Sequence, residues 1–206
     1  MREFGERQIR VISDILECAA ERAGQSLSIM VHGDLSAEVC ALTVVSPSHV
    51  ADAVQERVGA EAWVVTQTFF GPLNGDARLA IPGDPAVRIV RALIGNGPLE
   101  GEPSELEIDA LTEIGNIFLN AFIAEIADNL EAEIQTSVPH CARERDFSRL
   151  SGMEPGTDRE GVAMIVALDL CFGEAEADAC VLLTLNGITA AHLTRLVDRF
   201  GAEAGP

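Results

Sequence analysis

Basic residues are scarce in this chain. Its 206 residues include 14 Lys and Arg against 33 Asp and Glu, which gives a formal net charge of −19. No local cluster of basic side chains offsets this balance, so the sequence argues against nucleic-acid binding, and anionic membrane surfaces are disfavoured for the same reason. The charge instead suits a partner that carries a basic patch or a lysine-containing site.

Long apolar runs are also missing. No segment approaches the roughly 18 uncharged apolar residues that a membrane span requires, and the N-terminal segment MREFGERQIR is charged. We therefore expect no membrane association and a cytoplasmic location. A hydrophobic content of 48 % nevertheless predicts a well-packed globular chain.

Motifs for cofactors and metals are missing as well. The sequence contains no GxGxxG, no P-loop and no nucleophile elbow, and its four histidines are not at metal-ligand spacing. We therefore expect no metal or cofactor of the protein's own. The five cysteines form no CxxC pair, and we expect buried free thiols in a reducing compartment. They are Cys18, Cys40, Cys141, Cys171 and Cys180.

Periodicity and turn residues predict alternating helices and strands. In the first half we expect a helix over 5–23 that ends at Gly24, strands over 27–31 and 39–45, a helix over 46–60, a hairpin of strands 62–70 and 77–82, and a helix over 84–95. A Gly-, Pro- and Glu-rich linker over 96–105 leads into the second half. There we expect a helix over 104–130, a strand over 133–139, a loop over 140–160, a hairpin of strands 162–172 and 178–185, and a closing helix over 188–201.

The two halves repeat one pattern. FFGPLNGDARLAIPGDPAVRIVRALIG in the first half corresponds to CFGEAEADACVLLTLNGITAAHLTRLVDRFG in the second, a period of about 100 residues. The sequence therefore predicts an α+β fold, with an antiparallel sheet covered by helices and a pseudo-two-fold internal duplication. We expect a single domain over 1–206, made of repeats at about 1–98 and 103–206, whose hairpins join in one continuous sheet.

The central helix over 104–130 carries two patterns. Ser104 and Glu107 form a capping box at its start, and apolar residues recur at helical spacing on one side. The other side carries a polar stripe, which consists of Asp109, Glu113, Asn116 and Asn120. Asp and Asn are poor interior helix formers, so this stripe is either a solvated face or a functional one. Gly115 beside it would allow another backbone to approach closely.

The stripe also carries a resemblance to a known family. Asp109-x3-Glu113-x2-Asn116, followed by 22 residues and Pro139, resembles the signature of the CheC/CheX/FliY family of chemotaxis phosphatases. The words EIGN and SVP and the hairpin FFGPLNGDARLAIP look like CheC. The likeness covers both halves of the chain.

The resemblance implies a protein aspartyl-phosphate phosphatase that acts on a phosphorylated CheY-like receiver. Glu113 would pair with the receiver's lysine, and Asn116 would hold the attacking water in line. Asp109 and Asn120 would extend the partner-binding surface, and Pro139 would shape a strand entrance. The Mg²⁺ ion would belong to the receiver.

The first helix departs from a two-site pattern because it contains no asparagine. Depending on the repeat register, its corresponding slot is Glu6-x2-Ile9 or Asp14-x2-Glu17, so we expect one active site in the second half. A non-catalytic binding module, like the flagellar switch component FliM, is the alternative. Some family members also bind the receptor deamidase CheD, so CheD is a second candidate partner.

Overall fold

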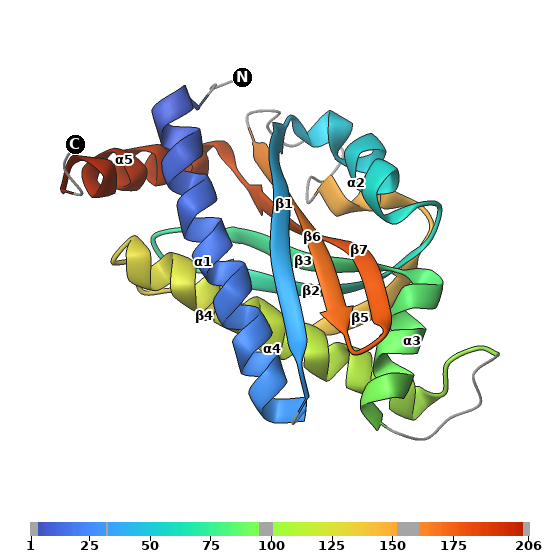
Figure 1. Cartoon of the computed structure of the whole chain (residues 1–206). Helices are drawn as coiled ribbons and strands as arrows, with labels where there is room; N and C mark the ends of the chain where they lie inside the picture. The colour runs from blue at the N-terminus through green and yellow to red at the C-terminus, as the bar shows by residue number, and fades with distance from the viewer. Residues whose placement is uncertain (1–3, 32, 95–100, 152–160, 204–206) are drawn as a thin grey trace.

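A seven-stranded antiparallel sheet forms the centre of the computed structural model, which describes residues 4–31, 33–94, 101–151 and 161–203 (Figure 1). The strands are β1 (Leu35–Val45), β2 (Ala62–Phe70), β3 (Gly75–Pro82), β4 (Gln135–Thr136), β5 (His140–Glu144), β6 (Val162–Phe172) and β7 (Ala175–Leu185). The helices are α1 (Glu6–Val31), α2 (Val50–Val58), α3 (Gly83–Ile94), α4 (Glu105–Asn129) and α5 (Gly187–Glu203), with short 3-10 helices η1 (Pro47–His49) and η2 (Phe147–Ser151). The predicted α+β class is confirmed.

The two halves of the chain meet at the middle of the sheet. The strand order is β1-β6-β7-β3-β2, and both β4 and β5 pair with the outer side of β2. Strands β3 and β7 pair from Gly75 with Leu185 to Ala80 with Cys180. Moving outward from this pair, each side meets a hairpin partner (β2 or β6) and then an edge strand (β5 or β1). The predicted continuous sheet with pseudo-two-fold order is therefore present.

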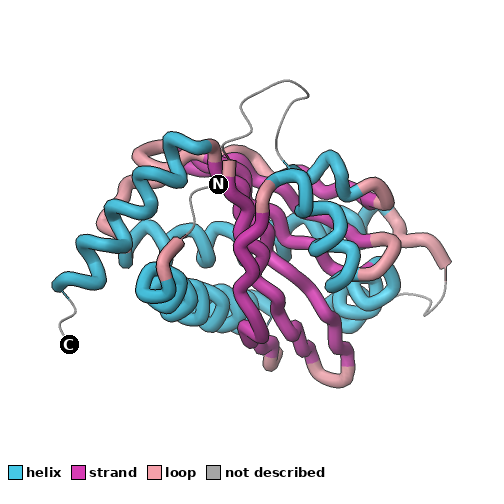
Figure 2. Tube along the Cα trace, turned by 90° about the horizontal axis from the view of Figure 1, so that it is seen from above, coloured by secondary structure: helices cyan, strands magenta, loops and turns pink. Residues whose placement is uncertain are grey.

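Helices cover both faces of the sheet (Figure 2). Side chains alternate between the faces along each strand. On β2, for example, Trp63, Val65 and Phe69 join the core beneath α1, α3, α4 and α5, whereas Val64 joins a smaller core beneath α2 and η2. Helix α4 is long and apolar enough to span a membrane by length and composition, but its largest apolar side chains are buried in this core.

The first helix is longer than predicted. Residues 27–31, expected as a strand, form the last turns of α1. Leu27 continues the buried stripe of the helix, while Ile29 is 77 % exposed. Gly24 does not end the helix; it faces Ala37 of β1, where an added Cβ would lie 3.2 Å from the Ala37 nitrogen. Packing on β1 therefore overrides the local helix-stop signal.

The segment after α4 also differs from the prediction. Of the strand expected over 133–139, only Gln135–Thr136 is a strand, and β5 forms inside the expected loop over 140–160. Helix α5 continues past Gly201 to Glu203. The expected linker over 96–105 and loop over 140–160 lie partly outside the described residues.

All five cysteines are free, but only Cys180 is buried. Burial raises the pKa of its thiol to about 12. The expectation of generally buried thiols was wrong for Cys18 and Cys40, which are exposed. Cys40 lies where β1 shifts its register against β6, between Val39 and Ala41.

Candidate functional site

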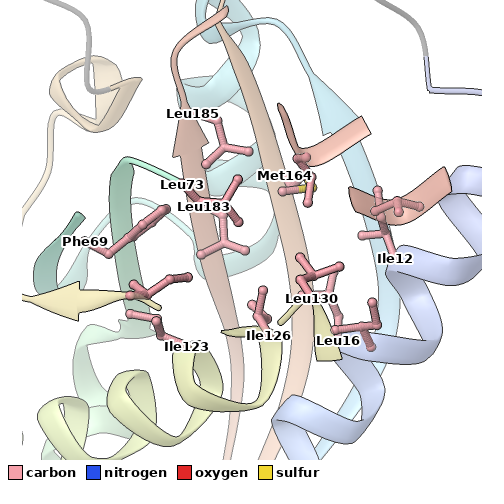
Figure 3. A pocket seen from close by; sticks show the side chains of 14 residues that line it. Ile12, Leu16, Phe69, Leu73, Ile123, Ile126, Leu130, Met164, Leu183 and Leu185 are labelled. Atoms are coloured by element: carbon pink, nitrogen blue, oxygen red, sulfur yellow. The ribbon is translucent and has the colours of Figure 1, made fainter. Parts of the chain in front are cut away.

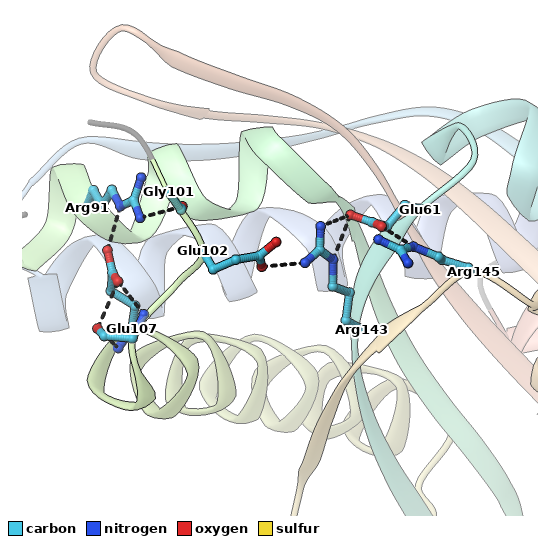
Figure 4. A network of polar contacts seen from close by, with 8 residues as sticks. Glu61, Arg91, Gly101, Glu102, Glu107, Arg143 and Arg145 are labelled. Atoms are coloured by element: carbon cyan, nitrogen blue, oxygen red, sulfur yellow. Dashed lines mark hydrogen bonds and ion pairs between the residues drawn. The ribbon is translucent and has the colours of Figure 1, made fainter. Parts of the chain in front are cut away.

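The start of α4 is fixed by buried charge pairing (Figure 4). The predicted capping box is present: the Ser104 backbone N–H donates to Glu107 Oε2 at 2.7 Å, and the Glu107 N–H donates to Ser104 Oγ at 3.3 Å. Arg91 of α3 donates from Nε to Glu107 Oε1 at 2.5 Å. Donation from Arg91, and then from Ser104, lowers the pKa of Glu107 to about 2.

A second group of charges ties the same region to the sheet (Figure 4). Arg143 of β5 binds Glu102, two residues before Ser104, at 2.5 Å and binds Glu61, just before β2, at 2.5 Å. Arg145 also donates to Glu61. Together with the Arg91–Glu107 pair, these contacts hold the N-terminus of α4 against α3, β2 and β5.

Gly115 sets how closely α4 approaches β2. A Cβ added at Gly115 would lie 2.5 Å from both Cβ and Cγ2 of Val65. No real side chain tolerates that distance, so only glycine fits here. The close approach expected at this position is present, although the neighbour is the Val65 side chain and not a backbone. It places α4 directly over the next inward-facing residue of β2, which is Gln67.

Gln67, Asn116 and Asn120 form an amide cluster between β2 and α4. Gln67 Nε2 donates to Asn116 Oδ1 at 3.2 Å and to Asn120 Oδ1 at 3.3 Å. Asn120 Nδ2 also donates to Asn116 Oδ1 at 2.8 Å. Thr136 of β4 completes the cluster, because its hydroxyl donates to Asn120 Oδ1 at 3.0 Å. Gln67 is 1 % exposed, whereas both asparagines are partly exposed.

A bulge over residues 137–139 closes the cluster on its other side. Thr136 pairs with Phe69 and His140 pairs with Thr66, so three residues lie opposite two of β2. This is a β-bulge, and Pro139 fits in it because proline has no N–H to offer a ladder. Pro139 thus lies directly before β5. The resemblance implied that this proline shapes the entrance of a strand.

Ser137 anchors this bulge to β2. Its N–H donates to the Thr68 carbonyl at 2.8 Å, and its Oγ accepts from the Thr68 N–H at 3.0 Å. Its own carbonyl accepts from Gln67 Nε2 at 3.2 Å. The next residue, Val138, is 87 % exposed. The bulge therefore turns one backbone carbonyl inward and one apolar side chain outward.

The two carboxylates of the polar stripe lie in a different environment. Glu113 and Asp109 are exposed, and neither has a hydrogen-bond or ion-pair partner among the described residues. Glu113 precedes Asn116 by one helical turn on the same face. The structure therefore brings Asn116 and Asn120 together in the cluster and leaves Glu113 and Asp109 free to meet a partner.

Gln67, Thr136 and Ser137 are the members of this site that the sequence prediction missed. The available signal was Gln67 itself, since it interrupts the apolar residues that otherwise fill the inward face of β2. A buried polar side chain must find hydrogen-bond partners. The sequence could not supply those partners, because they come from a helix and a bulge far along the chain.

Two other candidate features offer less chemistry. An apolar cavity of about 40 Å³ lies between α1, α4, α5 and the sheet, and only apolar side chains line it (Figure 3). A cavity of this kind holds no group that could act on a polar substrate. In the part of the chain that the structure describes, no three His, Cys, Asp or Glu side chains are grouped to hold a metal ion.

Known structures share this architecture. Thermotoga maritima FliY matches with a TM-score of 0.74 and 16 % identity, over 98 % of this chain and 99 % of that chain. The FliM middle domain from H. pylori matches with a TM-score of 0.67 and 11 % identity, over 94 % of this chain and 99 % of that chain. The chain has the CheC/CheX/FliY fold.

A third structure with this fold is the chemotaxis protein CheX from Desulfovibrio desulfuricans. It matches with a TM-score of 0.54 and 13 % identity, over 84 % of this chain and 99 % of that chain. No family model and no curated protein sequence matches the chain. At these identities the likeness establishes the fold, and the CheC/CheX/FliY fold found here agrees with the resemblance of the polar stripe.

Proposed function

We propose that this protein is a phosphatase for the aspartyl phosphate of a CheY-like receiver, with one active site on α4. The proposal rests chiefly on one observation: Asn116 is held by two hydrogen bonds to its Oδ1, at 2.8 and 3.2 Å, one turn after the exposed Glu113. An anchored amide beside an unpaired carboxylate, on a helix face open to a partner, suits catalysis in which a second protein supplies the phosphoryl group.

The proposed reaction requires few catalytic groups from the phosphatase itself. Hydrolysis of an acyl phosphate needs a water placed in line with the phosphorus, and positioning of that kind accounts for much of phosphoryl-transfer catalysis. A rigid Asn116 amide would orient the water. Glu113 would dock on the receiver's lysine, and the receiver would contribute its own Mg²⁺. Asp109 would extend the docking surface, and Asn120 would serve mainly by holding Asn116.

A non-catalytic binding module is the second candidate. The similarity to the FliM middle domain favours it, because FliM is the example of a non-catalytic binding module with this fold. The Glu113 and Asn116 pair favours the phosphatase, because a binding surface alone has no need of an anchored amide. CheD stays a candidate partner for either role, and we place the protein in chemotaxis-type signalling in the cytoplasm.

Loss of phosphate from a phosphorylated receiver tests the proposal directly. Purified receivers from the same genome are phosphorylated with a small-molecule donor, and dephosphorylation is followed with and without this protein. We expect the wild type to accelerate the loss for a cognate receiver. Asn116→Ala should lower kcat by about 100-fold, because the water loses its positioning group.

Glu17→Ala on α1 is the matched control, since it removes a polar side chain, here an exposed one, from the other long helix that packs on the sheet. It should leave kcat unchanged. A wild type that matches buffer for every receiver would overturn the enzyme; receiver binding without turnover would then support the FliM-like role. Full activity in Asn116→Ala would show that another residue orients the water.

A further inference from the structure

The amide cluster has a fixed direction, and a backbone group sets it. A side-chain amide can be turned over to exchange its donor and acceptor ends, but a backbone carbonyl only accepts. The Ser137 carbonyl lies 3.2 Å from Gln67 Nε2, and Ser137 is itself bound to Thr68 through both its N–H and its Oγ. Gln67 must therefore present its NH₂ group to the bulge.

The same NH₂ group then decides how Asn116 is turned. Gln67 Nε2 lies 3.2 Å from Asn116 Oδ1, so Asn116 must offer its oxygen inward. Asn120 Nδ2 approaches the same oxygen at 2.8 Å. A carbonyl oxygen has two lone pairs, and these two donors occupy both of them. The atom that Asn116 keeps for a partner is Nδ2.

We propose that Gln67 is a positioning residue that fixes the polarity of the Asn116 amide, so that its NH₂ group and not its carbonyl faces the receiver. This inference rests on the proposed phosphatase function and deepens it, because it states which atom of Asn116 acts. Gln67 is buried and touches no substrate; it acts through Asn116.

An NH₂ group does different work from a carbonyl. Asn116 Nδ2 donates a hydrogen bond to one lone pair of the attacking water and leaves the other lone pair directed at phosphorus. As the water oxygen bonds to phosphorus, the bond from phosphorus to the aspartyl oxygen breaks and its electron pair returns to the carboxylate. Both water protons leave with the phosphate, one on the incoming oxygen and one on a phosphoryl oxygen. The amide neither gains nor loses a proton. The donor favours the attack by fixing the orientation of the water.

Gln67 also has an acceptor end, and its burial is informative. Its Oε1 is buried and has no hydrogen-bond partner among the described residues. An unmet buried acceptor costs stability. The chain keeps this cost while the two Nε2 hydrogens serve three acceptors within 3.3 Å, so that one hydrogen is shared between two of them. Leucine or methionine would fill the same inward position on β2 without that cost, which supports a role for Gln67 beyond packing.

Side-chain amide exchange in ¹⁵N-labelled protein tests the polarity without any activity measurement. The Gln67 Nε2 hydrogens should exchange slowly with solvent and the Asn116 Nδ2 hydrogens rapidly, with assignments from the signals lost in Gln67→Met and Asn116→Asp. In Gln67→Glu at pH 8 the buried carboxylate only accepts, so Asn116 should turn over and its Nδ2 hydrogens should become protected. Protected Asn116 hydrogens in the wild type would overturn the inference.

Kinetics then test the consequence. Gln67→Met and Gln67→Glu should each lower kcat by about tenfold or more while KM for the phosphorylated receiver changes less than about threefold, because Glu113 docking is intact. Thr184→Val is the matched control: it removes a buried hydrogen bond, from Arg78 at 3.0 Å, on the opposite face of the sheet. It should destabilise the protein comparably and leave kcat unchanged.

The outcomes separate this inference from the proposed function. An active wild type whose kcat survives Gln67→Met and Gln67→Glu would overturn the role of Gln67 and leave the phosphatase standing. An inactive wild type with protected Gln67 hydrogens would overturn the phosphatase, while the polarity of the cluster would stand. If Gln67→Glu does not fold, Gln67→Met still decides the kinetic question.

Discussion

Helices α1 and α4 bury the same pattern of positions and differ in what they expose. Buried residues recur in pairs 99 positions apart, such as Ile12 with Leu111 and Leu16 with Gly115. At this offset, Asp14 and Glu17 of α1 correspond to Glu113 and Asn116 of α4. Of the two possible registers, Asp14-x2-Glu17 and not Glu6-x2-Ile9 is therefore the counterpart of the candidate site.

The strands beneath the two helices differ even more. Helix α4 rests through Gly115 on Val65 of β2, which brings Gln67 under Asn116. Helix α1 rests through Gly24 on Ala37 of β1. The neighbouring core contacts of β1 are apolar, and they include Leu35 and Val39. In the candidate site, the strand below the helix holds one side chain of the polar stripe, through Gln67 and Asn116.

Charge reversal should give the largest difference between α4 and α1. Glu113→Lys should lower kcat/KM for the phosphorylated receiver by about 100-fold, because it places like charges together at the docking lysine. Asp14→Lys changes the net charge equally on α1, and we expect less than about threefold. Steady-state kinetics at several receiver concentrations measure both. Equal losses would mean that the overall negative field, and not a specific pair, recruits the receiver.

Substitution of the two helix glycines should give the next largest difference. Gly115→Ala forces α4 away from Val65, and we expect a loss of about 1–3 kcal/mol in the free energy of unfolding and about tenfold in kcat. Gly24→Ala meets its nearest atom at 3.2 Å, a contact that a small shift relieves, and the gain in helix propensity of about 1 kcal/mol offsets it. Urea unfolding and the phosphatase assay compare the variants. A neutral Gly115→Ala would show that α4 can slide without harm.

Acid should affect the contacts of α4 and α1 differently. The folded pKa of Glu107 lies at about 2, below its ordinary value of 4.5. A lowered pKa stabilises the fold fully above the ordinary value, and that stabilisation is lost as the pH falls toward 2. The Tm difference between wild type and Glu107→Gln should therefore be largest near pH 6 and shrink by pH 2.5.

The end of α1 provides the control for acid. There Ser28 Oγ donates to the Leu35 carbonyl at 2.8 Å and accepts from the Leu35 N–H at 2.9 Å, and both contacts are uncharged. The Tm effect of Ser28→Ala should not change with pH over the same range. A constant difference for Glu107→Gln would mean that Arg91 and Ser104 do not stabilise its charged form.

The sequence predicted the elements that depend on local signals and missed those that depend on distant partners. Strand β2, the capping box of α4 and the duplicated hairpins carry their periodicity and turn residues within themselves, and they are present. The end of α1 was missed because Gly24 signals a stop only until β1 packs against it. The bulge at Ser137 and its link to Gln67 join residues 70 positions apart, which no local pattern encodes.

Grafting the missing amide onto α1 should have the smallest effect. In an Asn116→Ala background, Asp14→Glu with Glu17→Asn recreates the Glu-x2-Asn pair of α4 at the corresponding positions. We expect kcat to stay at the level of Asn116→Ala, because β1 offers no glutamine to hold the new amide and a mobile amide orients water poorly. Any rise toward wild-type kcat would show that the helical pair is sufficient by itself. A graft that remains inactive and correctly folded by circular dichroism would place the decisive difference between the two halves in the strand, at Gln67, and not in the helix.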